Sequence, residues 1–151
     1  MAPPLRSRKE VEELKKNIDY VYTIGTDHCT FKRELKNQKL LQGMPLGIGG
    51  VEHSFLVMNG LFNIPIIKKM TKNVAKVHNL FPRKGIIKVG SDADLFIMDR
   101  EVALLNKNHS KCDYNLYENV KSYGEILSTI SRGKFVIKDN EFKGGIGKYI
   151  K

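Results

Sequence analysis

A short apolar run that ends abruptly in an acid is the feature that most constrains this chain. Residues 20–26 are rich in β-branched and aromatic side chains, which is typical of a strand, and Asp27 follows directly. Parallel α/β barrels carry their catalytic groups where strands end and loops begin. We therefore expect a buried parallel strand here, and Asp27 is the first catalytic candidate.

The segment before this strand is predicted to be a helix. Ser7 and Glu10 have the spacing of a reciprocal capping box, so a helix should begin after Ser7. Val11, Leu14 and Ile18 recur at helical spacing and should form its buried stripe. A helix followed by a strand is half of an α/β unit.

A glycine-rich stretch at residues 42–52 is the second feature of interest, because Gly47, Gly49 and Gly50 fall within four positions. It has neither the Walker spacing nor the dinucleotide fingerprint. Two interpretations remain open. The stretch is either a loop that lets backbone approach a ligand, or a tight turn before a helix.

The remaining pattern divides the chain near Pro82. Before it, we expect helices over residues 51–59, closed by Gly60, and from Pro65 onward with a break at 71–73. After it, short strands are predicted at residues 86–89, 95–99, 102–105, 126–131 and 135–137. Residues 1–82 should therefore be an α/β part and residues 83–151 a small β-module.

Composition limits the class of protein. A chain of 151 residues suits one ordinary core, and no stretch approaches the roughly 18 consecutive apolar residues of a membrane helix. Cys29 and Cys112 are far apart, so reduced thiols in a cytoplasmic protein are expected. The net charge of +10 would suit a nucleic-acid binder, but the lysines lack interleaved stacking aromatics, which makes nucleic acid an unfavoured partner.

Five stretches, in order, resemble motifs of the cyclic amidohydrolases of the hydantoinase and dihydropyrimidinase group. They are residues 3–6 (PPLR), 26–29 (TDHC), 45–52 (PLGIGGVE), 83–95 (RKGIIKVGSDADL) and 131–136 (SRGKFV). The resemblance covers nearly the whole chain. It implies the last helix-strand-helix part of a (β/α)8 metal-dependent hydrolase barrel, followed by a small β-module that is part of a β-sandwich.

The resemblance also implies a chemistry. The family opens the amide bond of a ring such as hydantoin or dihydropyrimidine with two zinc ions or other divalent metals. The family's aspartate at the position of Asp27 is a metal ligand and handles the proton released during attack on the carbonyl, a role that a carboxylate can fill. The matching substrate-binding positions are Leu46, Gly47 and Ala2.

Other acids and histidines fit structural roles better. Asp92 and Asp94 follow a glycine-serine turn, where aspartates commonly cap backbone amides. Strand alternation turns His28 away from Asp27, which favours a packing or hydrogen-bonding role over metal ligation. The remaining histidines have no metal-ligand spacing.

The sequence departs from the family pattern in ways that bear on function. The H-x-H pair, the carboxylated lysine and two further histidines of the family's metal site have no counterpart here, and the chain has room for a single barrel strand. Leu46 replaces the loop asparagine that binds the ring amide, and Ala2 replaces a serine.

These departures lead to three expectations. The chain should be the C-terminal portion of a longer amidohydrolase, should be inactive and metal-free by itself, and should self-associate through open strand edges as a homo-oligomer. Two alternatives stay open. One is a non-catalytic, dihydropyrimidinase-like scaffold or interaction protein, and the other is a basic nucleic-acid binder.

Overall fold

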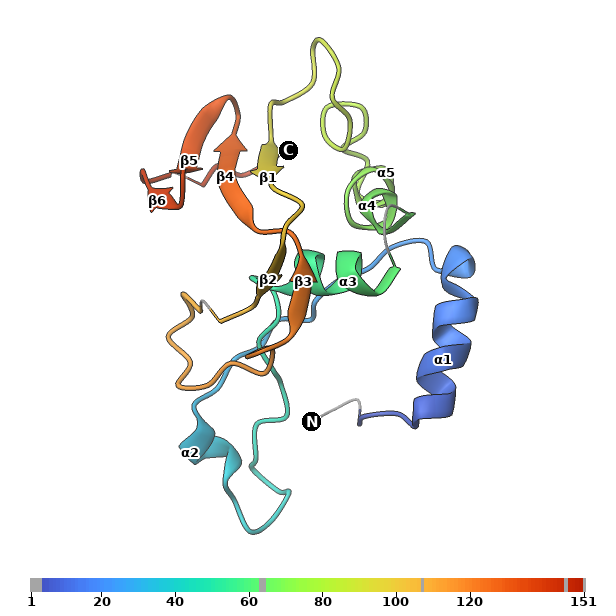
Figure 1. Cartoon of the computed structure of the whole chain (residues 1–151), viewed down its shortest axis with the longest axis vertical. Coiled ribbons are helices and arrows are strands. Elements are labelled where there is room, and N and C mark those ends of the chain that lie inside the picture. Colours follow the sequence, from blue (N-terminus) through green and yellow to red (C-terminus); the bar gives the residue numbers. More distant parts are fainter. Residues whose placement is uncertain (1–3, 63–64, 107, 146, 151) are drawn as a thin grey trace.

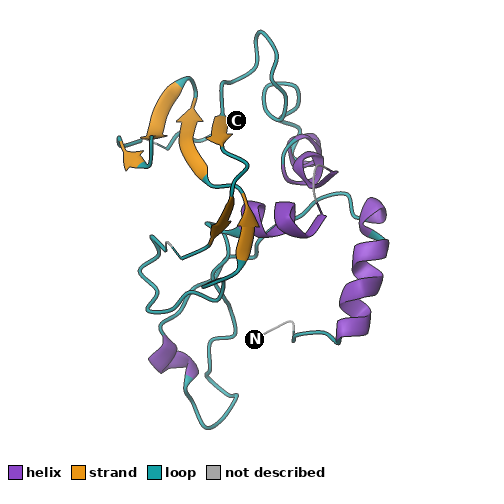
Figure 2. Ribbon diagram, viewed as in Figure 1, coloured by secondary structure: helices purple, strands orange, loops and turns teal. Residues whose placement is uncertain are grey.

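Helices occupy the first half of the chain and strands the second (Figures 1 and 2). The computed structural model describes residues 4–62, 65–106, 108–145 and 147–150. No helix within these ranges is long and apolar enough to cross a membrane. The helices are α1 (Arg8–Lys16), η1 (Ile18–Tyr20), α2 (Arg33–Lys36), α3 (Ser54–Phe62), α4 (Pro65–Met70) and α5 (Lys72–Val77). The strands are β1 (Leu95–Met98), β2 (Val102–Leu104), β3 (Lys121–Tyr123), β4 (Ile126–Ser131), β5 (Lys134–Lys138) and β6 (Glu141–Phe142).

The larger sheet is antiparallel, with the strand order β1-β4-β5-β6. Its central hairpin turns through Arg132 and Gly133, whose φ angles are 48° and 77°. Positive φ at both central residues is the geometry of a type I′ turn, which matches the twist of the flanking strands. The strands predicted at residues 126–131 and 135–137 are therefore confirmed, whereas β6 was not predicted.

The smaller sheet pairs β2 with β3, and α3 packs against β3. Within α3, a side chain on Gly60 would meet the Tyr123 ring at 3.3 Å, and Asn59 Nδ2 donates to Tyr123 O. The prediction that Gly60 closes this helix is wrong. The helix continues to Phe62 because Gly60 faces β3, and tertiary packing outweighs the low helix propensity of glycine.

The first helix forms as predicted but is not buried as predicted. The capping box is present, since Ser7 Oγ accepts from Glu10 N and the Glu10 carboxylate accepts from Ser7 N. Val11 and Leu14, however, are 41% and 54% exposed. The apolar stripe of α1 faces solvent because the described residues pack only the adjoining η1 against this helix, which stands apart from the rest in Figure 1.

The strand predicted at residues 20–26 does not form: Tyr20 ends η1, and residues 21–26 have no regular secondary structure. Their hydrogen bonds run to the helices instead, because Ile24 N donates to Lys69 O at 3.2 Å and Asn73 Nδ2 donates to Tyr22 O at 2.8 Å. Lys69 is buried and donates through Nζ to Val21 O. A strand requires a neighbouring ladder, and the described residues supply none beside this segment.

A second predicted strand, at residues 86–89, is also absent. This segment forms turns, in which Ser91 N donates to Lys88 O and Ser91 Oγ donates to Pro82 O. The side chains of Ile87 and Val89 are 86% and 99% exposed. The β-branched composition suggested a strand, but no strand of the described residues pairs with this segment.

Three charged side chains hold this turn to the β4–β5 hairpin. Lys84 Nζ contacts Asp92 Oδ2 at 2.8 Å and also pairs with Asp94, while Asp94 Oδ1 accepts from Arg132 N at 2.7 Å. The predicted capping of a backbone amide is confirmed for Asp94 but not for Asp92. Asp94 caps a backbone amide, whereas Asp92 instead pairs with Lys84 and Arg83.

The buried apolar core of the described residues is small: it consists of Leu56, Ile66, Ala75 and Leu105. The break predicted at residues 71–73 is confirmed at Thr71, which separates α4 from α5, whereas Lys72 and Asn73 already belong to α5. Much of the apolar surface of the chain therefore stays accessible.

Acid should weaken the contact between the turn and the hairpin. The hydrogen bond from Lys84 holds the pKa of Asp92 below its usual range. Burial alone would raise the pKa of Asp94, but hydrogen bonds from Lys84 and from the Arg132 amide outweigh it, so this pKa is lowered as well. Their contribution to stability is present above about pH 4 and should be lost as the pH falls through the lowered pKa values.

The Asp94→Asn variant should therefore lose part of the acid-dependent decrease in the free energy of unfolding. Urea titrations between neutral and acidic pH would measure this decrease. Glu118→Gln, at an exposed position, is the matched control and should keep the wild-type slope. Identical slopes in all three proteins would contradict the assignment.

Candidate functional site

Asp27 follows the segment of residues 21–26 and has a left-handed backbone conformation. Its φ is +44°, a left-handed conformation that aspartate tolerates better than most residues. The side chain is exposed. The chain thus presents a carboxylate to solvent at the position where the sequence predicted one, and such backbone outliers are often associated with functional sites.

The glycine-rich loop packs directly on the residues after Asp27. Cys29 N donates to Ile48 O at 2.9 Å. A Cβ on Gly47 would lie 2.5 Å from Cys29 Cβ, and one on Gly49 would lie 2.5 Å from Thr30 Cγ2. Any side chain at these two positions would collide with the neighbouring segment.

This packing gives the glycines a specific role. The interpretation as a loop of close backbone approach describes Gly47 and Gly49. The partner that they approach is the segment of residues 29–30 of the same chain, not a ligand. Leu46 is half-buried beside Gly47, and the neighbouring carbonyl of Pro45 accepts from Lys36 Nζ at 3.0 Å. Ala2 lies outside the described residues.

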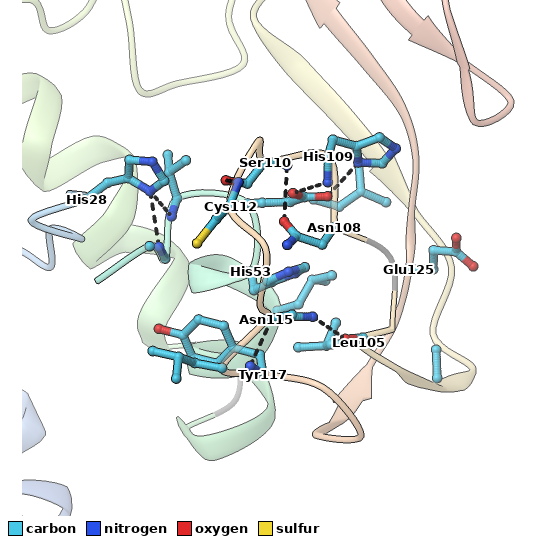
Figure 3. Close-up of a pocket in the computed structure, with 18 of the residues that line it drawn as sticks. His28, His53, Leu105, Asn108, His109, Ser110, Cys112, Asn115, Tyr117 and Glu125 are labelled. Atoms are coloured by element: carbon cyan, nitrogen blue, oxygen red, sulfur yellow. Dashed lines mark hydrogen bonds and ion pairs between the residues drawn. The ribbon is translucent and has the colours of Figure 1, made fainter. Parts of the chain in front are cut away.

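The histidines are placed by contacts that the sequence does not reveal. His28 Nδ1 accepts from Gly50 N and Val51 N, at 3.1 Å each (Figure 3). His109 binds Glu52 through both its backbone and its ring, with Nδ1 2.6 Å from Oε1. The hydrogen-bonding role predicted for His28 is confirmed, whereas the Glu52–His109 pair joins positions far apart in the chain and was missed.

A cavity of about 1020 Å³ opens between the start of α3, the segment after β2 and the β4–β5 hairpin (Figure 3). Among the described residues, Asp27, Leu46 and Gly47 are not part of its wall. His53 Nε2 is buried at this cavity without a hydrogen-bond partner in the described residues. Burial raises the pKa of Tyr114, and the neighbouring Cys112 adds to this effect.

The residues present do not by themselves fit a binuclear metal centre. Among the described residues, no group of three or more histidine, cysteine or acidic side chains is placed to hold a metal ion. Asp27 could supply one oxygen ligand, whereas a two-metal site requires several convergent donors. Both cysteines are free thiols, and Cys112 Sγ donates to Phe31 O.

Comparison with known proteins shows which family the chain belongs to. The model of the amidohydrolase family matches residues 5–136. The D-hydantoinase of Geobacillus stearothermophilus is 34% identical over 99% of this chain and 36% of its own length, and the dihydropyrimidinase of Rattus norvegicus is 32% identical over 99% and 32%. The chain belongs to the amidohydrolase family.

Solved structures agree with the sequence relatives. A D-hydantoinase from Thermus sp. superimposes with a TM-score of 0.80 at 32% identity, over 96% of this chain and 35% of that one. The L-hydantoinase of Arthrobacter aurescens gives a TM-score of 0.82 at 27% identity, over 94% and 35%. The chain therefore has the fold of about one third of these enzymes, which confirms the family suggested by its motifs.

The packing of the loop can be tested with a pair of glycine substitutions. Gly47→Ala should lower the free energy of unfolding by about 1–3 kcal/mol, because the added methyl group overlaps both backbone and side chain of Cys29. Gly25→Ala is the control, since nothing lies within 4 Å of its Cβ position. Urea denaturation would measure both, and equal effects would show that the loop does not pack on residue 29.

Proposed function

We propose that this chain contributes the C-terminal third of a metal-dependent amidohydrolase that hydrolyses a C–N bond of a cyclic amide of the hydantoin or dihydropyrimidine type. Similarity to D-hydantoinases and dihydropyrimidinases over nearly the whole chain supports this. In this proposal, residues 1–82 belong to the barrel and residues 83–151 form the small β-domain. A cytoplasmic location remains part of the proposal.

Asp27 is the residue on which the proposed chemistry depends. Its exposed carboxylate lies on a residue of left-handed backbone conformation, next to the segment that packs on the glycine-rich loop. We assign it as one metal ligand and as the group that accepts a proton when water attacks the ring carbonyl and passes it to the leaving nitrogen. Leu46, Gly47 and Ala2 are assigned to the substrate side of the site.

The remaining metal ligands, two zinc ions in our proposal, must come from outside this chain. The isolated 151-residue protein should therefore contain no stoichiometric zinc and should not hydrolyse hydantoin or dihydrouracil. Elemental analysis together with ring-opening assays would measure both properties. Two metals per chain with turnover would refute this part of the proposal.

A chimera provides the positive test. The matching third of the Geobacillus stearothermophilus D-hydantoinase would be replaced by this chain, and ring opening would be assayed. Turnover is expected, and Asp27→Asn should reduce it about 10²-fold or more. Asp139→Asn is a matched control, because Asp139 is also exposed with a positive φ, and it should leave turnover unchanged.

A second candidate function is a non-catalytic, dihydropyrimidinase-like scaffold. Leu46 favours it, because an apolar side chain occupies the loop position where the family pattern has a hydrogen-bonding asparagine. A folded, metal-loaded chimera without turnover would support this candidate. If Leu46→Asn then restored ring opening, the loss would be traced to that position.

Self-association is the partner interaction that we propose. The accessible surface is 11609 Å², about half as much again as the roughly 7,800 Å² expected for a compact monomer of 17.2 kDa. The excess is larger than a standard protein interface and includes the exposed stripe of α1. Light scattering should therefore give a mass that is a multiple of 17.2 kDa. A monomer at high concentration would contradict this.

A further inference from the structure

His28 connects the Asp27 turn to the glycine-rich loop. Its Nδ1 accepts hydrogen bonds from the backbone amides of Gly50 and Val51, at 3.1 Å each (Figure 3). A ring nitrogen accepts only when it carries no proton. The two bonds therefore assign the neutral imidazole with its proton on Nε2.

The other contacts between these segments do not depend on the side chain at position 28. Cys29 N binds Ile48 O through the backbone, and Gly47 and Gly49 allow close approach by lacking a side chain. His28 is the residue whose side chain holds loop amides. Without an acceptor at its Nδ1 position, the Gly50 and Val51 amides would lose their described partner.

The same loop leads directly into α3. Gly50 O accepts from His53 N at 3.2 Å and from Ser54 N at 2.8 Å. Fixing the Gly50 amide thus also fixes the entry to α3, which packs on β3. Gly50 is thus held through both of its backbone polar groups, with His28 at its amide and the start of α3 at its carbonyl.

We propose that His28 is a positioning residue, whose Nδ1 fixes residues 47–51 relative to the Asp27 carboxylate and so sets where a ring substrate meets the loop. The use of the loop for substrate rests on the proposed function. The hydrogen-bonded clamp itself does not, and it can be tested in the chain alone.

Two substitutions separate the effect of the hydrogen-bond acceptor at position 28 from the effect of side-chain size. In His28→Asn the amide oxygen is bonded to Cγ, as Nδ1 is, so the acceptor stays in place. In His28→Gln the amide group lies one bond further out and cannot replace Nδ1. His78→Gln, at the exposed C-cap of α5, is the control for a histidine without this contact.

Hydrogen exchange of the Gly50 and Val51 amides is the first measurement. Exchange should be slow in the wild type, in His28→Asn and in His78→Gln, and roughly five- to tenfold faster in His28→Gln. Equal exchange in the Asn and Gln variants would overturn the clamp. So would unprotected exchange of both amides in the wild type.

Nitrogen NMR of the His28 ring is the second measurement and needs no variant. The nitrogen chemical shifts should report a protonated Nε2 and an unprotonated Nδ1. A side chain that only filled space at this position would not select this tautomer. A ring protonated on Nδ1 would overturn the assignment, whatever the variants show.

The functional readout uses the hydantoinase chimera. His28→Gln should raise KM for the ring substrate more than it lowers kcat, and His28→Asn should restore the wild-type KM. An unchanged KM in His28→Gln, together with faster exchange of the Gly50 and Val51 amides in the same variant, would overturn the positioning role. A chimera without any turnover would count against the proposed function. Hydrogen exchange and NMR would still show whether His28 Nδ1 binds the Gly50 and Val51 amides.

Discussion

The site depends on the close contact between two segments that are about twenty residues apart in the sequence. Gly47 and Gly49 permit this contact, because a Cβ at either position would overlap Cys29 or Thr30. The Cys29–Ile48 backbone bond and the two amide bonds to His28 then hold the segments together. The position of the loop relative to Asp27 follows from these contacts, as does the entry of the chain into α3.

The second constraint is that the described residues place no partner strand beside the segment before Asp27. Its polar groups are satisfied by the buried Lys69 and by Asn73 instead of by a strand ladder. Buried backbone groups must find partners, and these two helical side chains supply them. The segment therefore ends at the Asp27 carboxylate, as a barrel strand ends at a catalytic group. The described residues, however, place no sheet around it.

Local signals were the reliable part of the prediction. The capping box at Ser7 is decided by neighbouring residues, and it was predicted with the right position. Two strand predictions failed. Residues 20–26 and 86–89 have strand composition, but the described residues place no strand beside them. The strand β3 was missed because its short sequence carries no strong alternation.

The sequence alone determined the family and the identity of the candidate carboxylate, because short motifs such as the one around Asp27 lie within a few consecutive residues. Tertiary structure decided what those residues touch. His28 meets the loop amides and Glu52 meets His109 across 22 and 57 positions of sequence. Such contacts depend on how the chain returns on itself, and glycines that lack a Cβ allow that return where the loop and the turn meet.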